Sequence, residues 1–439
     1  MVKSRSPRAE TRNEPLCRLL EELGWSVNGF ADRVRKRCDA VGQPRAVSRS
    51  TVSRWRSGTT PGPEWIGPVC FVLSAGARRQ ITPRSLGWPA DASNIAVDAL
   101  EYGDLAHAVR ALRQLWEVDA VADAAAARRM TLEGTLDPAV LQALVMPPDQ
   151  DLSGHGTQPV SLADIELLEG NTVLYGGLDA RHGGGRFRST FSMFLDRHAA
   201  PLLAGQFADR RGRHLYGCVA DAALALGSMA HDDLLPGLAQ RYDLQAMRLA
   251  QAIGDRGRLA RGHIHQARLA AVLGQPQDVL THARSAVVAA AGAPALVRAY
   301  AAVTEARAWA FSGDPERTLA AVEQARSAFS RAGSAADPQW LSWLDRPELE
   351  GQAAWALAQA GLAQAGAQAL KWAEEMSELR TRDRVELMLT GAELARLLGD
   401  EDERAALVAR ARRASRGLKS RRLASRLERA TQGKPIQEF

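Results

Sequence analysis

Residues 48–58 (SRSTVSRWRSG) combine side chains that can bind a nucleic acid with a spacing that places them on one helix face. Ser48 is suited to cap a first helical turn, and Gly58 before TTPGP ends the helix. Val52 and Trp55 form a buried stripe, so the arginines and hydroxyls face outward. Arginine can bond a guanine edge with two hydrogen bonds, and hydroxyls can reach bases or phosphates. The alternative is an arginine-rich surface helix.

The distribution of charge along the chain distinguishes these alternatives. Residues 1–90 hold 16 Lys+Arg against 7 Asp+Glu, residues 91–403 hold 29 against 41, and residues 404–434 hold 11 against 1. An arginine bias from codon usage alone would not leave the middle acidic between two basic ends. The basic first segment therefore predicts a polyanion as partner, and DNA is the obvious candidate.

Two further helices are predicted before this segment. Residues 14–23 have a proline near the start, four leucines on one face and a glycine at the end. In residues 27–38, Phe30, Ala31 and Val34 can pack while the neighbouring basic side chains stay exposed. The connector VGQPRAVS then leads to Ser48. The predicted order is helix, turn, second helix, connector and recognition helix.

The string AVSRSTVSRWRSGTTP is similar to the recognition-helix region of the lambda-repressor-like (XRE) helix-turn-helix family. The resemblance implies base-edge contacts by Arg49, Ser50 and Arg54, and phosphate contacts by Arg56 and the two threonines after Gly58. The chain departs from the family between its two central helices, where the spacing is about a dozen residues longer. Either the second helix is extended or a loop is inserted around residues 42–45. The predicted DNA-binding residues are Ser48, Arg49, Ser50, Thr51, Ser53, Arg54, Arg56, Thr59 and Thr60.

The rest of the chain is organised by repetition. Small residues recur nineteen positions apart in five successive pairs, and the turns LGQPQD, SGDPER, AGLAQA and LGDEDE separate the members of the last four. This spacing is typical of stacked antiparallel helix pairs of the tetratricopeptide type, although an alanine-rich chain supplies alanine in many registers. The pairs are Gly227 and Ala246, Ala267 and Ala286, Ala306 and Ala325, Ala354 and Ala373, and Ala392 and Ala411.

Two segments outside the regular repeat leave alternatives open. The insertion SAADPQWLSWLDRP carries Trp340 and Trp343, which either line a ligand or partner surface or fill the groove between stacked pairs. The basic segment 404–434 suits a capping helix of the solenoid, with Leu407, Leu418, Leu423 and Leu427 among its apolar positions. Its charge could alternatively contact DNA or the acidic middle of the chain.

Several apparent chemical motifs are discounted. Gly183–Gly185 followed by Arg186 lacks the features of a phosphate loop and predicts a hinge between helices. His263 and His265 lie two apart, so they point to different faces and are expected to be solvated or capped histidines. His231 with the two aspartates that follow is expected to be a helix-end cap. The four cysteines form no CxxC pair and predict neither zinc nor disulfides, and no Ser, His and Asp arrangement stands in a strand-turn-helix context.

The blocks DARHGGGRFRS, LDRHAAPLLAG, GRHLYGCVADAALALGSMAHDD and LAQRYDLQAMRLAQAIGD resemble the helical-repeat half of a group of actinobacterial transcriptional regulators. These regulators join an XRE-like domain to tetratricopeptide-like repeats. The resemblance implies a cytoplasmic, DNA-binding regulator of development or secondary metabolism, with a peptide or protein effector on the repeats.

The sequence therefore predicts an all-α protein with a helix-turn-helix domain in residues 1–90, a helical linker or the start of the helical scaffold in 91–215, and tetratricopeptide-like repeats with a basic capping helix in 216–439. The expected function is sequence-specific transcription regulation as a homodimer on double-stranded DNA. The alternative is a protein-interaction scaffold with only non-specific affinity for DNA. No enzyme activity, cofactor, metal or membrane partner is expected.

Overall fold

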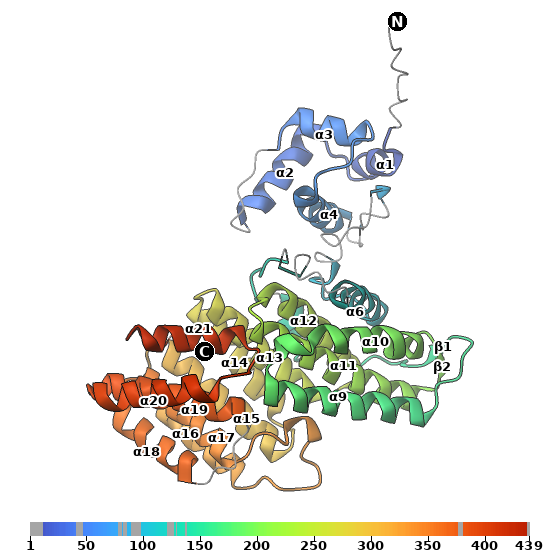
Figure 1. The fold of residues 1–439 in the computed structure, drawn as a ribbon. Coiled ribbons are helices and arrows are strands. Elements are labelled where there is room, and N and C mark those ends of the chain that lie inside the picture. Colours follow the sequence, from blue (N-terminus) through green and yellow to red (C-terminus); the bar gives the residue numbers. More distant parts are fainter. Residues whose placement is uncertain are drawn as a thin grey trace, which may run out of the picture. The chain divides into compact units, whose positions relative to one another are not determined.

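The chain folds into α-helices, as the sequence predicts (Figure 1). The computed structural model describes residues 12–40, 47–77, 81, 86–88, 98–120, 127–128, 130–136, 138–375 and 381–436. Two compact units are present, residues 1–101 and residues 102–439.

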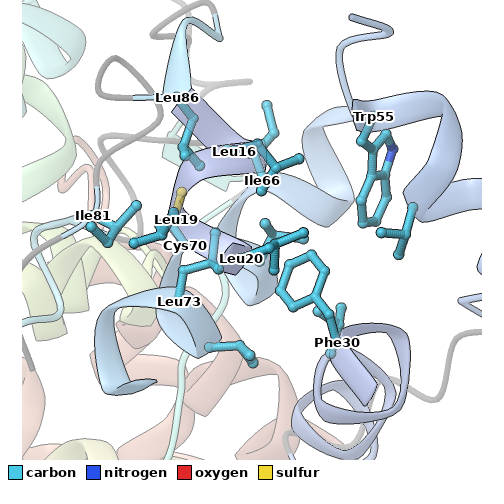
Figure 2. Close-up of a cluster of buried hydrophobic side chains, with 14 of the residues drawn as sticks. Leu16, Leu19, Leu20, Phe30, Trp55, Ile66, Cys70, Leu73, Ile81 and Leu86 are labelled. Carbon is cyan, nitrogen blue, oxygen red and sulfur yellow. The ribbon is translucent and has the colours of Figure 1, made fainter. Parts of the chain in front are cut away.

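The first unit contains helices α1 (Glu14–Glu22), α2 (Val27–Ala40), α3 (Arg49–Arg56) and α4 (Pro63–Ala77). Asn13 caps α1 by accepting a hydrogen bond from the Leu16 amide. Figure 2 shows that side chains from all four helices, with Ile81 and Leu86 beyond them, share one hydrophobic core. A single core of this kind fixes the faces that the helices turn outward.

Helix α2 runs on to Ala40, so the longer spacing before α3 includes an extended second helix. Residues 42–45, where the sequence places the alternative inserted loop, lie outside the described residues. Phe30, Ala31 and Val34 are buried as predicted.

The second unit begins with helices that pack against the first repeat pair. Helix α6 contacts α10 and α12, and α9 contacts α11 and α19. Residues 147–159 contain a two-residue strand that the sequence does not indicate, and this strand pairs antiparallel with a second one near residue 206. These elements are α6 (Leu105–Ala120), α8 (Pro138–Gln142), β1 (Gly154–His155), α9 (Leu162–His182), η2 (Gly184–Arg186), α10 (Arg188–Leu203) and β2 (Gln206–Phe207).

Five helix pairs follow, and each is the pair that the sequence spacing predicts. The members of a pair pack on each other, and successive pairs contact one another along the chain, from α11 in green to α20 in red (Figure 1). The pairs are α11 (Asp209–Asp232) with α12 (Pro236–Ile253), α13 (Arg256–Val272) with α14 (Pro276–Ala290), α15 (Ala295–Phe311) with α16 (Pro315–Phe329), α17 (Arg346–Gln359) with α18 (Ala363–Glu375), and α19 (Thr381–Leu398) with α20 (Glu401–Ala414).

Small residues allow close approach within the pairs. A Cβ atom added at Gly227 would lie 2.3 Å from Asp243 Oδ1, and Ala267, Ala306 and Ala325 are fully buried. The side chain of Ala373 lies outside the described ones. The repeat register predicted from the small residues is therefore the register of helix packing.

The turns within the last four pairs each place a glycine in the left-handed region. Gly274, Gly313, Gly361 and Gly399 have φ between 66° and 78°. In the first pair the corresponding turn has Leu234 at φ 57° instead, a conformation that is uncommon for a leucine. This difference explains why the turn signal is missing from the sequence of the first pair.

Two elements complete the unit. The insertion between α16 and α17 contains the short helix η3 (Gln339–Leu341), and α21 (Arg421–Thr431) follows α20. Leu407 and Leu423 are buried and Leu418 and Leu427 are partly buried in one cluster with residues of α17 and α19. The basic C-terminal segment therefore caps the described stack of helix pairs.

Candidate nucleic-acid interface and repeat cavity

The recognition helix predicted by the sequence is α3. The Ser48 hydroxyl accepts a hydrogen bond of 3.2 Å from the Thr51 amide and so caps the helix, and Gly58 follows its end with φ 93°. Val52 and Trp55 are buried, and the Trp55 ring packs against Trp65 at 6.1 Å between ring centroids. One face of α3 is thus held in the core.

The opposite face of α3 is exposed and polar. Arg49, Ser50, Ser53 and Arg54 are all exposed, and Thr51 is half-buried beside the cap. Thr59 and Thr60, beyond the helix, are exposed as well. The predicted base-edge residues therefore share one accessible surface. Helix α3 has 8 residues, which is about two helical turns.

Arg56 differs from the other predicted contacts. It is half-buried, its carbonyl accepts a hydrogen bond of 2.8 Å from the Asn13 amide, and its Nε is buried. Its backbone therefore ties α3 to the start of α1. Any phosphate contact made by Arg56 would use the terminal nitrogens of its guanidinium group.

A cavity of about 610 Å³ lies on the inner face of the repeats. The paired helices that line it are α11, α13, α15, α17 and α19, which are the first members of their pairs. Helix α9, the insertion around η3 and Arg422 of α21 close its sides. A volume of this size is typical of a small-molecule site.

One wall of the cavity is basic and comes from α13. Arg258, Arg261, His265 and Arg268 follow one another at i, i+3, i+7 and i+10, so they share a helix face. Arg258 binds both carboxylate oxygens of Asp221, at 3.1 and 2.7 Å, whereas the closest approach of Arg261 to that carboxylate is 3.7 Å. Burial lowers the pKa of Arg261, and Asp221 only partly offsets this effect.

Within this wall, His265 is buried and packs against Asp243 of α12. Nδ1 of His265 lies 2.8 Å from Asp243 Oδ1, and Nε2 lies 3.5 Å from the Ser228 hydroxyl. Burial raises the pKa of Asp243 well above its ordinary value and lowers that of His265 well below its own. Both shifts favour the uncharged pair, so Asp243 adds little negative charge beside Arg261.

The expectation that His263 and His265 are solvated or capped is wrong. His263 is fully buried with its Nδ1 3.2 Å from Nδ1 of His282, whose Nε2 lies 3.1 Å from the Thr135 carbonyl. The argument that the two side chains point to different faces is correct for one helix. Neighbouring helices cover both faces of α13, so both histidines are buried.

Ser228, His265 and Asp243 have the residue types of an acyl-transfer triad, brought together from three helices. Ser228 lies inside α11, where backbone amides are engaged in intrahelical hydrogen bonds. An acyl-transfer site also needs free amides or other donors for the oxyanion. The arrangement is therefore better explained as buried packing at the edge of the cavity.

The insertion supplies aromatic side chains next to the basic wall. The guanidinium carbon of Arg261 lies 5.0 Å from the Trp340 ring centroid, and Trp343 packs edge-on against Tyr300 at 5.2 Å. Both tryptophans are half-buried and line the cavity. The two tryptophans thus line the cavity and also pack on side chains of two neighbouring pairs, so neither alternative left open by the sequence is excluded.

The far end of the cavity is lined by Glu348 and Gln352 of α17. The Gln352 amide nitrogen donates a hydrogen bond of 3.0 Å to Glu348, while the Gln352 Oε1 is buried and accepts none among the described residues. Burial raises the pKa of Glu348 to about 8, and the nearby carboxylates of Asp383 and Glu386 add to the shift. Glu348 is thus largely protonated at neutral pH.

Replacing Glu348 with glutamine is expected to flatten the pH dependence of stability. The folded chain holds this proton more tightly than the unfolded chain, so the stabilisation is complete below about pH 4.5 and is lost as the pH rises through 8. At pH 8.5 the variant should be more stable than the wild type, by on the order of 1–3 kcal/mol. Urea unfolding followed by circular dichroism at pH 6 and 8.5 measures this, with exposed Glu323→Gln as the control. Parallel pH profiles for Glu348→Gln and the wild type would contradict it.

A buried ionic network borders the same end of the cavity. Asp232 is 1% exposed and accepts hydrogen bonds of 2.7 Å from the Ser420 hydroxyl and 3.2 Å from the Gly184 amide. Arg382 and Arg422 approach the same carboxylate at 3.8 and 3.4 Å. The expectation of a helix-end cap is therefore wrong for Asp232, which joins α11 to the C-terminal segment.

The basic helix α21 also binds the acidic middle of the chain. Arg422 and Arg426 both pair with Glu386 of α19, the second at 3.4 Å. Burial alone would raise the pKa of Glu386, but the guanidinium groups of Arg422, Arg426 and Arg382 outweigh it and hold the pKa well below its ordinary value. Capping by α21 thus combines apolar packing with ion pairs.

Gly183 lies between α9 and η2, where the sequence predicts a hinge, and makes a close backbone contact there. Its φ is 86°, and an added Cβ would lie 2.6 Å from the Lys419 carbonyl. The Lys419 amide donates a hydrogen bond of 2.7 Å to the His182 carbonyl. The glycine therefore lets the segment before α21 pass directly over the end of α9.

The four cysteines are buried free thiols. Burial raises the pKa of Cys70 and Cys218 to about 12, as expected for packing residues that stay protonated. The thiol of Cys218 lies within 4.8 Å of ligand atoms of Glu169 and His214. Since both of those side chains are exposed, this grouping does not by itself indicate a metal site.

In the comparisons with known proteins, one match was found, and it lies within the first unit. Residues 16–89 match the family model described as the SP15 N-terminal domain, and this region, which contains most of α1 and all of α2 to α4, is similar to that family. No curated protein matches the chain, and no solved structure matches it. Among the described residues, no helix combines the length and apolar character needed to cross a membrane.

Proposed function

We propose that the protein is a sequence-specific DNA-binding transcriptional regulator, in which α3 reads the major groove and the repeats hold an effector. The observation that carries this proposal is the two-sided character of α3. One face is fixed in a core by Val52 and Trp55, and the other exposes Arg49 and Arg54 within a basic unit. The resemblance to XRE-like and tetratricopeptide-like regulators of actinobacteria adds support.

In the proposed mechanism, basic side chains bind phosphates and supply affinity, while a few residues of α3 choose the sequence. Arg49 and Arg54 would bond base edges, since a bidentate arginine-guanine contact discriminates by about 1–3 kcal/mol. Thr59 and Thr60 would bind the adjacent phosphates. A second copy of the chain would contact a second half-site about 34 Å away. The effector would shift the population of dimers whose spacing fits the operator.

The test is selection of genomic DNA fragments by the purified full chain. The selected site is then titrated at two salt concentrations with the wild type and with an Arg49→Ala, Arg54→Ala double variant. We expect a two-fold motif whose preference over random DNA disappears in this variant, because the base-edge contacts are lost. A double variant of α2, Arg35→Ala and Lys36→Ala, is the control. It removes the same charge from another exposed surface and should keep the preference.

The outcome that contradicts the proposal is binding that enriches no motif, weakens with salt and is equal in the two double variants. That result would favour the alternative, a helical-repeat scaffold with non-specific affinity for DNA. Circular dichroism of both variants checks that they are folded. Both replace exposed side chains, so each should keep the wild-type spectrum.

A further inference from the structure

The repeat cavity has a surplus of positive charge on one wall. Asp221 and Asp255 both pair with Arg258, at 2.7 and 2.5 Å. Arg261 lies farther from Asp221, and Arg268 donates a hydrogen bond of 2.8 Å to the Tyr300 hydroxyl. Buried guanidinium groups are costly unless an anion compensates them. A ligand with a negative group would supply that compensation.

Flat rings lie next to these guanidinium groups. Trp340 faces Arg261, and Trp343 and Tyr300 meet edge to face. The tryptophans belong to the insertion that lengthens one repeat step, so the lining of the cavity is a specific addition to the repeat pattern. Aromatic rings beside a cavity stack readily on a planar ligand.

Next to the charged groups Arg382, Glu386 and Arg422, the part of the cavity lined by α17 offers a hydrogen-bond acceptor. The Oε1 of Gln352 is buried and accepts no hydrogen bond among the described residues, and Glu348 lies beside it. A buried acceptor of this kind is uncommon without a partner, and a ligand N–H or O–H would satisfy it. The cavity therefore offers three kinds of contact: anion binding, stacking and an acceptor for a donor group.

We propose that the cavity binds a small anion that carries a planar ring. Arg261 and Arg268 bind its negative group, Trp340 and Trp343 stack on the ring, and Gln352 accepts a hydrogen bond from it. The volume of about 610 Å³ suits a small molecule rather than a folded partner. The ligand would be the effector of the proposed function, and only its regulatory role rests on that proposal.

The test compares two dyes that differ in charge. The fluorescent anion 1-anilinonaphthalene-8-sulfonate and the neutral N-phenyl-1-naphthylamine are titrated into the full chain. We expect one anion site with an affinity at least tenfold above that of the neutral dye. An Arg261→Gln, Arg268→Gln double variant should lose about tenfold in affinity for the anion and none for the neutral dye, since charge-assisted hydrogen bonds are removed.

The control variant is Arg317→Gln. Arg317 lies over the Trp309 ring at 4.5 Å, outside the cavity lining, and is 63% exposed. The Arg317→Gln variant also loses an arginine that stacks on a tryptophan. It should bind the anionic dye with the affinity of the wild type. Equal affinities for the two dyes, or anion binding unchanged in the double variant, would overturn the proposal.

Competition with the wild type removes any dependence on the folding of variants. Benzoate and phenyl phosphate should displace the anionic dye while benzyl alcohol should not, and the stronger competitor identifies carboxylate or phosphate as the group preferred. Displacement by benzyl alcohol as effective as by the two anions would refute charge selection. Dye binding in a protein that selects no DNA motif would leave this inference standing and reject the proposed function alone.

Discussion

Replacing Asp232 with alanine is expected to lower the free energy of unfolding of the repeat unit by about 3–5 kcal/mol. The carboxylate is 1% exposed, and it accepts hydrogen bonds from Ser420 and the Gly184 amide. Arg382 and Arg422 also lie next to it. Alanine would leave two buried guanidinium groups with less negative charge and two donors without their acceptor, while providing no compensating interaction.

The exposed pair of Glu323 with Arg326 provides the matched control. Glu323 is 61% exposed and pairs at 2.7 Å, so Glu323→Ala should cost about 1 kcal/mol or less. Urea unfolding of the full chain at pH 7, followed by circular dichroism, compares the two variants. A change for Asp232→Ala no larger than that for Glu323→Ala would mean that the network adds nothing beyond a surface ion pair.

The pH dependence of the Asp232→Ala effect provides a second check. Burial alone would raise the pKa of Asp232, but the two guanidinium groups and the hydrogen bonds lower it below the ordinary value. The stabilisation is therefore present above the unfolded pKa of about 3.8 and is lost as the pH falls through the folded value. The difference in the free energy of unfolding between the wild type and Asp232→Ala should persist from neutral pH to about pH 4 and become smaller below that pH.

The network also joins the C-terminal helix to the cavity wall. Arg382, Glu386 and Arg422 line the cavity and bind Asp232 or one another. A ligand that contacts these groups would therefore act directly on the residues that hold α21 in place. The basic tail is a structural part of the repeat unit, and the sequence alone left its contacts open.

The helix pairs and helix α3 could be predicted because their signals are local. Ser48 marks the start of α3 and Gly58 marks its end. The nineteen-residue spacing from Ala267 to Ala286 fixes the register of one pair. Caps, turns and small residues act through neighbours in the same helix or the next one. These features need no knowledge of how distant helices meet.

The cavity could not be predicted in the same way, because its residues come from the first members of all five pairs. One signal was present: Arg258, Arg261, His265 and Arg268 form a polar stripe at helical spacing within a repeat, where an apolar face would otherwise be expected. The partner of His265 could not be found from spacing, because Asp243 lies on a different helix. The role of the two tryptophans likewise depended on where the insertion crosses the repeats.

Replacing Trp55 with alanine is expected to destabilise the first unit by about 3–5 kcal/mol, because it removes a large buried side chain from a small core. Trp55 is 3% exposed and packs against Trp65, and Figure 2 shows it beside the other core side chains. Hydrogen exchange of backbone amides in residues 14–73, measured by mass spectrometry, reports this unit separately from the repeats. Arg54→Ala alters the adjacent exposed position. It should change the opening free energy that amide exchange reports by no more than about 0.5 kcal/mol.

The Trp55 variant also separates the folding of α3 from its proposed contacts. Loss of the core anchor should weaken binding to every DNA sequence together, since the whole surface of α3 loses its fixed orientation. The Arg49 and Arg54 substitutions should instead remove the preference while leaving amide protection intact. If Trp55→Ala kept both wild-type protection and sequence preference, the buried face of α3 would not be what orients Arg49 and Arg54, and the two-sided helix would no longer support the proposed function.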